Sequence, residues 1–285
     1  MTELLDFEET GHMLETEKYN LHYHEAGDGP VLILLHGSGP GVSGWSNFRG
    51  NLPVFAKQFR TIILDMPGFG MSTVGEIDRL YPKIGADGTR VLMDELGIDK
   101  AHFLGNSMGG AVTMQLALDN PERCDRLVMM GPGGINTLGP ATSEGGTRLM
   151  EFLENPTREG MLAWVHCMVA NKSIITDQLI DERMKNALMP GVMEMARKIR
   201  ASQSNPKFFD EVPNWARLHK LKNEVLLTWG RDDRMVPLDM GLFPFRRMPN
   251  AEMHIFSKCG HWAQVERKDD FERLVIDFLT RPITA

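Results

Sequence analysis

The sequence predicts an α/β protein whose mostly parallel sheet is covered by helices on both faces. Short apolar runs of strand length alternate with helical segments along most of the chain, which is typical of parallel strands buried on both faces. From about Thr142 to Phe209 this alternation stops and only helices are expected. The 285 residues suit one large α/β domain with an insertion, or two small domains.

The composition is that of an ordinary globular protein and argues against several classes of partner. Hydrophobic residues make up 42% of the chain, and the net charge of -7 leaves no basic excess to neutralise nucleic-acid phosphates. The three cysteines are widely spaced and fit neither a disulfide framework nor a zinc site, which indicates a reducing cytoplasm. The N-terminus lacks a signal-peptide core, and no apolar run approaches the length of a membrane span. We therefore expect a cytoplasmic protein without nucleic-acid or membrane partners.

The first predicted elements are a hairpin and a series of buried strands. Leu14 to Glu25 alternates polar and apolar residues, as in an antiparallel hairpin. His22 and His24 share one strand face there, and an exposed pair is expected because a metal site would need further ligands. Buried strands are predicted over Val31 to Leu35, Thr61 to Leu64, Ala101 to Leu104 and Arg126 to Met130. A helix over Gly88 to Leu96 precedes the third of these strands.

The second half of the chain interrupts the sheet with helices and then returns to it. The helical stretch is broken at Asn155-Pro156, Pro190-Gly191 and Asn205-Pro206. Strands follow over Glu224 to Trp229 and Ala251 to Phe256, and Asp269 to Leu279 forms a last helix. A helical interruption between two strands predicts a lid at the carboxyl edge of the sheet, where such sheets bind ligands. We expect a core domain over 1–134 and 215–285 and a helical lid over 135–214.

The pentapeptide Gly105-Asn106-Ser107-Met108-Gly109 lies between a predicted strand and a predicted helix. This strand–turn–helix context is the one that a nucleophile elbow requires. The sharp turn would strain Ser107 and expose its hydroxyl at the tip of the sheet, while the flanking glycines let strand and helix approach closely. The alternative is a plain glycine-rich turn, because the pattern also occurs by chance.

Two later loops supply the partners that a serine nucleophile needs. A base oriented by an acid is required, in the chain order serine, acid, histidine. Asp232 and Asp233 follow one predicted strand, and His261 follows the next. We take Asp233 as the acid and expect Asp232 to make a structural contact. Each residue alone could equally be a cap or turn residue, and the other eight histidines are expected to be structural or exposed; His36 is expected to brace its own loop.

Acyl chemistry also needs donors for a developing oxyanion. The backbone N–H of Met108, directly after the serine, is the first candidate. The second is expected from the glycine-rich loop His36 to Gly41, at Ser38 or Gly39. The simpler interpretation of that loop is a turn, but its Gly and Pro content indicates close approach of the backbone to a ligand.

These motifs resemble the α/β-hydrolases and, within them, the meta-cleavage-product hydrolases of bacterial aromatic degradation, such as those of the biphenyl, dioxin and carbazole pathways. Enzymes of that family cleave a carbon–carbon bond in 2-hydroxy-6-oxo-hexa-2,4-dienoates. The matching segments are His36 to Gly41, Trp45-Ser46-Asn47, Gly105 to Gly110, Met130 to Gly134, Trp229 to Arg234 and Cys259 to Gln264. The resemblance covers most of the chain and is weakest in the predicted lid. It implies the α/β-hydrolase fold, with a mostly parallel eight-stranded sheet.

The resemblance also implies roles for individual residues. Ser107, Asp233 and His261 match the triad, and Ser38 and Met108 match the oxyanion positions. Asn47, Asn106, Arg183 and Trp262 match the polar subsite for the dienoate carboxylate and 2-oxygen, and Gly39 is assigned to substrate binding. The residues expected in the apolar subsite are Met161, Trp164, Met168, Trp215, Met235 and Val236, although such apolar positions are more often plain core. Two departures leave the favoured side group open: Ser38 stands where many members have Gly, and Met235 where biphenyl-type members have an aromatic residue.

Arg183 also has a rationale from the residue type, because a planar cation suits a carboxylate. A solvated arginine on a helix over Asp177 to Leu188 is the alternative. The resemblance implies a small anionic dienoate as substrate, no metal or organic cofactor, and a homo-oligomer of two or more subunits. Two other functions stay open: a serine carboxylesterase, which would not need Arg183 or Asn106, and a non-catalytic ligand-binding member of the fold. Members with an aspartate nucleophile are disfavoured by Ser107.

Overall fold

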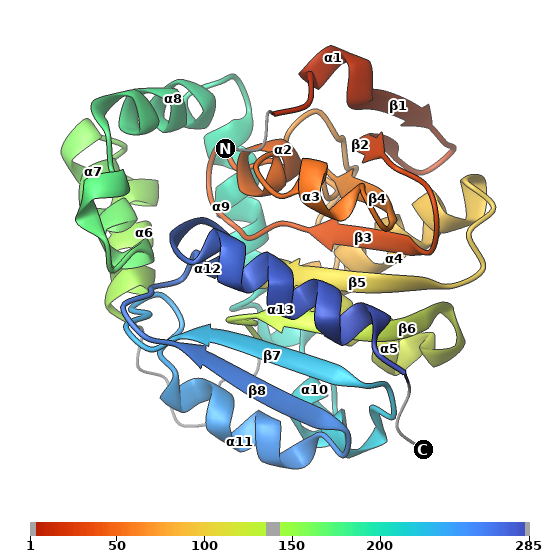
Figure 1. Cartoon of the computed structure of the whole chain (residues 1–285). Coiled ribbons are helices and arrows are strands. Elements are labelled where there is room, and N and C mark those ends of the chain that lie inside the picture. Colours follow the sequence, from red (N-terminus) through yellow and green to blue (C-terminus); the bar gives the residue numbers. More distant parts are fainter. Residues whose placement is uncertain (1–3, 135–142, 283–285) are drawn as a thin grey trace.

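An eight-stranded sheet forms the centre of the molecule in the computed structural model, which describes residues 4–134 and 143–282 (Figure 1). The strands lie in the order β1-β2-β4-β3-β5-β6-β7-β8. β2 runs antiparallel to both of its neighbours, and every other pairing is parallel. Their bounds are β1 Gly11–Glu15, β2 Asn20–Ala26, β3 Val31–Leu35, β4 Arg60–Leu64, β5 Ala101–Asn106, β6 Cys124–Met130, β7 Val225–Gly230 and β8 Ala251–Phe256. The predicted fold class and all of the predicted strands are confirmed.

Helices cover both faces of this sheet. They are α1 Phe7–Thr10, α2 Gly44–Phe48, α3 Leu52–Phe55, α4 Tyr81–Glu95, α5 Met108–Asp119, α6 Glu144–Glu154, α7 Arg158–Met168, α8 Asp177–Ala187, α9 Val192–Ser202, α10 Asn214–Arg217, α11 Asp239–Arg247, α12 Ala263–Glu266 and α13 Lys268–Thr280. Short 3-10 turns lie at Pro121–Arg123, Lys172–Ile174, Pro206–Phe208 and Leu218–Lys220. α13 crosses the face of the sheet that is turned toward the viewer in Figure 1, and α4 and α5 lie behind the sheet.

Two apolar layers hold the helices to the sheet. Because side chains alternate along a strand, Leu32 and Leu34 of β3 point into the layer that contains α2, α3 and α13, while Ile33 and Leu35 point into the layer that contains α4 and α5. All six residues of β5 are buried. Each fully buried large apolar side chain contributes roughly 1.5–3 kcal/mol, so the layers fix the strand ends that carry the site.

The segment between β6 and β7 forms a helical insertion, which we define as α6 to α9. It lies beyond the carboxyl ends of the parallel strands (Figure 1). A small apolar core of its own, including Phe152, Trp164 and Ile180, joins these helices. The predicted breaks at Asn155-Pro156, Pro190-Gly191 and Asn205-Pro206 all fall outside the four helices and are confirmed. The predicted start of the lid at residue 135 lies outside the described residues.

The expected exposed histidine pair is wrong. His22 and His24 do share a face of β2, but they are only 4% and 1% exposed. Phe7 from α1 and Trp45 from α2 fold over that face, with ring centroids 4.6 and 4.3 Å from the His24 ring. The alternation along β2 could not show that the N-terminal segment covers the strand's second face. Among the described residues, no group of three or more His, Cys, Asp or Glu could hold a metal ion.

The helix before β5 is longer than predicted, because it begins at Tyr81 rather than Gly88. Its glycines are weak helix formers, but they serve close packing. A Cβ at Gly85 would lie 2.6 Å from the Val112 side chain, and one at Gly88 would lie 2.4 Å from Pro67. Tertiary contact therefore overrides the local preference.

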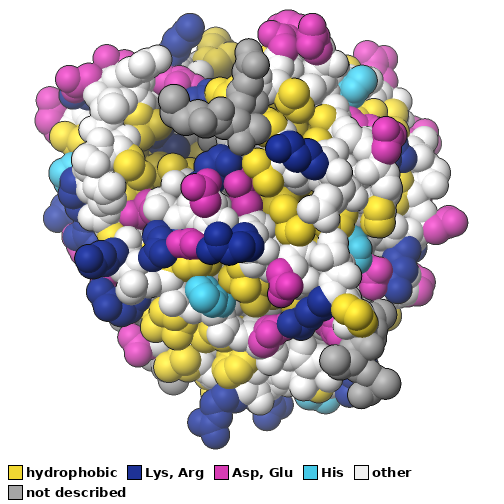
Figure 2. All heavy atoms as spheres, viewed as in Figure 1, with side chains coloured by type: hydrophobic (Ala, Val, Ile, Leu, Met, Phe, Trp, Pro, Cys, Tyr) yellow, Lys and Arg dark blue, Asp and Glu magenta, His cyan; other side chains and the backbone are white. Residues whose placement is uncertain are grey.

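The surface does not concentrate charge of one sign on the face seen in Figure 2. Basic and acidic side chains are interspersed there, with hydrophobic side chains between them. Within the described part of the chain, no helix is both long enough and apolar enough to cross a bilayer.

Candidate active site

Ser107 occupies the sharp turn between β5 and α5. Its φ of 53° is a left-handed value, which among the described non-glycine residues only Lys258 shares. Close packing maintains this strained conformation. A Cβ at Gly105 would lie 2.4 Å from the Gly109 carbonyl oxygen, and one at Gly109 would lie 2.0 Å from the Leu35 carbonyl oxygen. Only glycine fits at either position, so the pentapeptide forms the elbow that its sequence predicts.

His261 and Asp233 form a buried pair at the ends of two other strands. His261 Nδ1 lies 2.7 Å from Asp233 Oδ2. The second oxygen, Oδ1, accepts the backbone N–H groups of Met235 and Val236 at 2.8 and 2.9 Å. Because a carboxylate only accepts, Nδ1 carries the proton and Nε2 keeps a free lone pair.

The backbone around this pair leaves little freedom. Gly131, at the end of β6, would place a Cβ 3.1 Å from His261 Nδ1 and 3.2 Å from Asp233 Oδ2. The neighbouring Asp232 is exposed and pairs with Arg231 at 3.3 Å. Of the two candidate acids, Asp233 is thus the one that contacts the histidine.

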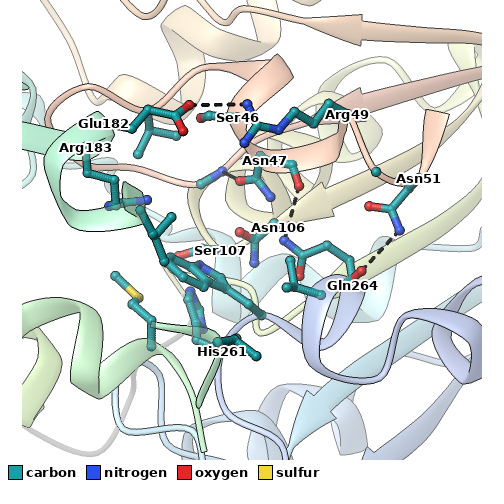
Figure 3. A pocket seen from close by; sticks show the side chains of 18 of the residues that line it. Ser46, Asn47, Arg49, Asn51, Asn106, Ser107, Glu182, Arg183, His261 and Gln264 are labelled. Atoms are coloured by element: carbon teal, nitrogen blue, oxygen red, sulfur yellow. Dashed lines mark hydrogen bonds and ion pairs between the residues drawn. The ribbon is translucent and has the colours of Figure 1, made fainter. Parts of the chain in front are cut away.

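A cavity of about 520 Å³ lies between the sheet edge and the helical insertion. Ser107 and His261 line it together with Asn47 and Asn106 from the core, and Arg183 reaches it from α8 of the insertion (Figure 3). Ser38, Met168, Met235 and Trp262 also line it. The structure therefore brings the three triad candidates and the four polar-subsite candidates to one place, with Asp233 directly behind His261.

Two donors in this cavity have no partner among the described residues. Asn47 Oδ1 accepts the Gly37 N–H at 3.0 Å, which fixes the amide so that its buried Nδ2 is left unpaired. The Nε of Arg183 is also buried and unpaired. Unpaired buried donors are costly, so this pair favours an acceptor supplied by a ligand.

The Arg183 guanidinium lies between two aromatic rings. Its central carbon is 5.1 Å from the Trp164 ring and 5.2 Å from the Trp262 ring. Burial lowers the pKa of Arg183 to about 10, so it remains cationic at neutral pH. The adjacent Glu182 pairs with Arg49 instead, at 3.2 Å. The cavity thus holds a buried positive charge and an amide donor, groups that are suited to binding a carboxylate.

Asn106 lines the core side of the cavity, whereas His36 is fully buried at the start of the glycine-rich loop that contains Ser38. Asn106 is 1% exposed and donates from Nδ2 to the Met130 carbonyl at 3.4 Å. His36 accepts the Met66 N–H on Nε2 at 3.0 Å and donates from Nδ1 to the Gly37 carbonyl at 2.7 Å. Burial lowers the pKa of His36, so this neutral ring braces its own loop as predicted.

Several predicted contacts lie away from the cavity. Gly39, with φ of 137°, packs against the Trp164 ring, which is itself buried in the core of the insertion with Met161. Trp215 packs near Phe243, with ring centroids 6.2 Å apart. The Val236 carbonyl accepts the indole N–H of Trp229 at 2.8 Å. The cavity lining includes none of Gly39, Met161, Trp164, Trp215 and Val236.

Other residues that line the cavity were not predicted from the sequence. The polar ones are Ser46, Arg49, Asn51, Thr176, Gln178, Glu182, Gln264 and Lys268. Gln264 and Ser46 belong to motifs that support the resemblance, so their position beside His261 and Asn47 was a usable signal. Thr176 and Gln178 surround the start of α8, where only the fold could place them.

Comparison with known proteins agrees with this geometry. Residues 30–268 match the family model described as alpha/beta hydrolase fold. A 2-hydroxy-6-oxo-6-phenylhexa-2,4-dienoate hydrolase of Burkholderia cepacia is 39% identical, over 98% of this chain and 99% of that protein. A 2-hydroxy-6-oxononadienedioate/2-hydroxy-6-oxononatrienedioate hydrolase of Comamonas testosteroni is also 39% identical, over 92% and 91%.

Solved structures of such hydrolases also superpose on this chain. The 2-hydroxy-6-oxo-6-phenylhexa-2,4-dienoate hydrolase from Rhodococcus sp. strain RHA1 superposes with a TM-score of 0.85 at 30% identity, covering 95% of this chain and all 100% of that one. A meta-cleavage product hydrolase from Pseudomonas fluorescens IP01 gives a TM-score of 0.83 at 33% identity, over 95% and 98%. The chain therefore belongs to the α/β-hydrolase family and, within it, to the meta-cleavage product hydrolases.

Proposed function

We propose that this protein hydrolyses the C5–C6 bond of 2-hydroxy-6-oxo-hexa-2,4-dienoates, giving 2-hydroxypenta-2,4-dienoate and a carboxylic acid. The observation that supports this most is the Arg183 guanidinium, whose buried Nε has no partner among the described residues, in the same cavity as Ser107 and His261. An ordinary ester substrate has no carboxylate for it to bind. The names of the relatives from Burkholderia cepacia and Comamonas testosteroni support the same substrate class.

The reaction begins with tautomerisation, because a bare carbanion is too basic to leave. The 2-hydroxyl loses its proton and C5 gains one, which gives a 2,6-diketone with a C3–C4 double bond. When C5–C6 then breaks, the electron pair passes through that double bond to the 2-oxygen as a conjugated dienolate. In this proposal Arg183, Asn47, Asn106 and Trp262 hold the carboxylate and the 2-oxygen, where this charge collects.

Ser107 is the proposed nucleophile at C6. His261 removes its proton, and Asp233 holds the imidazole and stabilises its charged form. The Met108 N–H and the Ser38 residue are the proposed donors to the C6 oxyanion. Cleavage leaves an acyl group on Ser107, and His261 gives its proton to the departing dienolate, which becomes 2-hydroxypenta-2,4-dienoate. The neutral imidazole then activates a water that releases the acyl group as the carboxylic acid. Met168 and Met235 line the cavity near His261 and are the proposed contacts for the C6 substituent.

One assay separates the candidate activities. The meta-cleavage product is yellow, so a C–C hydrolase bleaches it at a saturable rate, whereas an esterase leaves the colour and cleaves nitrophenyl esters faster. A non-catalytic binder does neither. We expect bleaching by the wild-type protein and its loss in Ser107→Ala. A panel of C6 substituents then identifies the preferred aryl, alkyl or fused-ring group.

The role of Arg183 predicts a selective defect. Arg183→Gln should reduce dienoate turnover by on the order of 100-fold, because the loss of a charged hydrogen bond costs about 2–3 kcal/mol. Turnover of a nitrophenyl ester should fall much less, since that substrate lacks the carboxylate. Equal losses on both substrates would contradict the assignment.

The covalent step has its own test. Rapid mixing of enzyme with substrate, acid quenching and mass measurement of the peptide that contains Ser107 should reveal an added acyl mass during the first turnover. A single turnover that completes with no acylated peptide at any time would favour direct attack by water instead.

The organisation of the whole protein is also proposed. Residues 135–214 would form the lid of a core made by 1–134 and 215–285, in a homo-oligomer of the cytoplasm. The three cysteines are buried and free, which supports a reducing compartment. Light scattering of the purified protein measures the subunit number directly.

A further inference from the structure

The Glu266 carboxylate joins the helical insertion to the loop that contains His261. Its Oε1 accepts the backbone N–H of Gly260 at 2.7 Å. Its Oε2 accepts the N–H groups of Ala170 and Asn171, both at 2.8 Å. Ala170 and Asn171 follow α7 of the insertion, whereas Gly260 directly precedes His261. One side chain thus holds two segments that are far apart in the sequence.

The same two segments also touch through their backbones. The N–H of His261 donates to the Met168 carbonyl at 2.6 Å. Gly260 lies so close that a Cβ there would be 2.6 Å from the Met168 oxygen and 2.8 Å from the Val169 Cα. The position of the His261 backbone is therefore set directly by the insertion.

All three groups that meet Glu266 are donors, so the site requires an acceptor on both side-chain oxygens. A carboxylate provides this, and charge-assisted bonds to backbone N–H groups are the stronger kind. A glutamine of the same shape would turn its NH₂ group toward at least one of these N–H groups. The contact is thus specific for the charged residue and is not a matter of packing alone.

We propose that Glu266 is a positioning residue, which aligns the His261 imidazole on Ser107 by tying its loop to residues 168–171 of the insertion. This inference rests on the proposed function only in that His261 is the base. Correct placement of a catalytic group is worth a large factor in rate, since a misplacement of about 1 Å costs on the order of 100-fold. The insertion would then do more than cover the cavity. The position of its residues 168–171 against the His261 loop would also set the reactivity of Ser107.

The test compares Glu266→Gln with Glu159→Gln. Glu159 is exposed on α7 and makes no hydrogen bond or ion pair to any part of the chain that the structure describes. Hydrogen exchange should become faster in Glu266→Gln at peptides spanning 168–172 and 258–262 together, and remain unchanged at β5 and β6. The rate at which a small fluorophosphonate labels Ser107 should fall at least about tenfold, with dienoate kcat falling in parallel and KM little changed. The control variant should match the wild type.

Several outcomes would overturn the proposal: unchanged exchange, faster exchange in only one segment, or faster exchange in both with an unchanged labelling rate. A measurement on the wild-type protein covers the case in which Glu266→Gln does not fold. The amides of Ala170, Asn171 and Gly260 should then show equal protection from hydrogen exchange, because one opening event releases all three. Protection factors that differ by more than about tenfold would contradict a shared link through Glu266. If the wild type labels normally but does not bleach the dienoate, the proposed function fails while the exchange and labelling results still decide this inference.

Discussion

The hydrogen bonds around His24 determine where its single proton lies. The Thr10 hydroxyl donates its proton to the Asp6 carbonyl at 2.8 Å, so it can only accept from His24 Nδ1, which lies 3.0 Å away. Nε2 is therefore unprotonated, and it is buried without a partner among the described residues. A second proton would have to sit there without an acceptor. Burial, assisted by the neighbouring His22 and opposed by Asp65, lowers the pKa of His24 to about 4.

This residue predicts a pH dependence of stability. Between pH 4 and 6.5 the unfolded chain binds a proton at His24 that the folded chain excludes, so the free energy of unfolding decreases as the pH falls through that window. His24→Phe keeps a ring against Phe7 and Trp45 but cannot titrate. We expect it to flatten the dependence by at most about 1.4 kcal/mol per pH unit. Urea unfolding of both proteins at several pH values measures the difference, and parallel curves would refute the buried neutral ring.

Single residues were predictable where their role is local. Ser107 was identified because the elbow needs glycines at fixed offsets, and Asp233 and His261 because parallel strands deliver their following loops to one edge. The environment of His22 and His24 depends instead on α1 and α2, which the alternation along β2 does not encode. The choice of Asp233 over Asp232 agrees with the hydrogen bond to His261, but chain order could not distinguish these adjacent aspartates, and it was the family resemblance that matched Asp233 to the triad.

At the scale of elements, the glycine-rich loop after β3 packs directly on α7 of the insertion. A Cβ at Gly39 would lie 2.3 Å from Cη2 of Trp164, whose ring covers the Arg183 guanidinium. The loop also presents Ser38 to the cavity. A change at the contact between Gly39 and Trp164 is therefore expected to displace both Ser38, the proposed oxyanion donor, and Arg183, the proposed carboxylate ligand.

Gly39→Ala should consequently raise the KM for the dienoate about tenfold or more, because the displaced Trp164 ring no longer fixes Arg183. Gly97→Ala is the control, since Gly97 also has a positive φ, while among the described residues no atom beyond its chain neighbours lies within 4 Å of the added Cβ. Gly97→Ala, at φ of 63°, should lose about 1 kcal/mol from backbone strain. Gly39→Ala should lose more, both because its φ of 137° lies outside the left-handed helical region and because of the clash. Steady-state kinetics and thermal unfolding measure the two effects. A normal KM in Gly39→Ala would show that the ring position is unimportant for binding.

Elements themselves followed well from the apolar runs, since burial on both faces leaves a clear pattern over Val31–Leu35 and Val225–Gly230. The residues of the apolar cavity lining could not be predicted from such runs. Trp215 and Val236 pack on the main core, whereas Met168 and Met235 reach the cavity. The same residue types serve both purposes, so the composition of a segment cannot tell a core position from a binding position.

On the scale of the whole molecule, the cavity is complete only when core and insertion are together. Ser107, His261 and Asn47 belong to the core, while Arg183 and Met168 belong to the insertion. A bound carboxylate would touch both parts and add to the ion pair that Arg49 and Glu182 already form between them. That pair is half exposed and worth less than about 1 kcal/mol, so a ligand is expected to be the stronger link.

A stable analogue makes this link measurable. Sorbate is a hexa-2,4-dienoate without the 6-oxo group, so it can occupy the carboxylate site but cannot be cleaved. A ligand at 100 times its dissociation constant stabilises the native state by about 2.7 kcal/mol, which corresponds to a rise in Tm on the order of 5 °C for a chain of this size. We expect that rise in the wild type and in Arg148→Gln, which alters an exposed arginine of α6. It should disappear in Arg183→Gln, because that variant removes the buried positive charge and the guanidinium donors that would bind the carboxylate; an equal rise in that variant would place the carboxylate elsewhere.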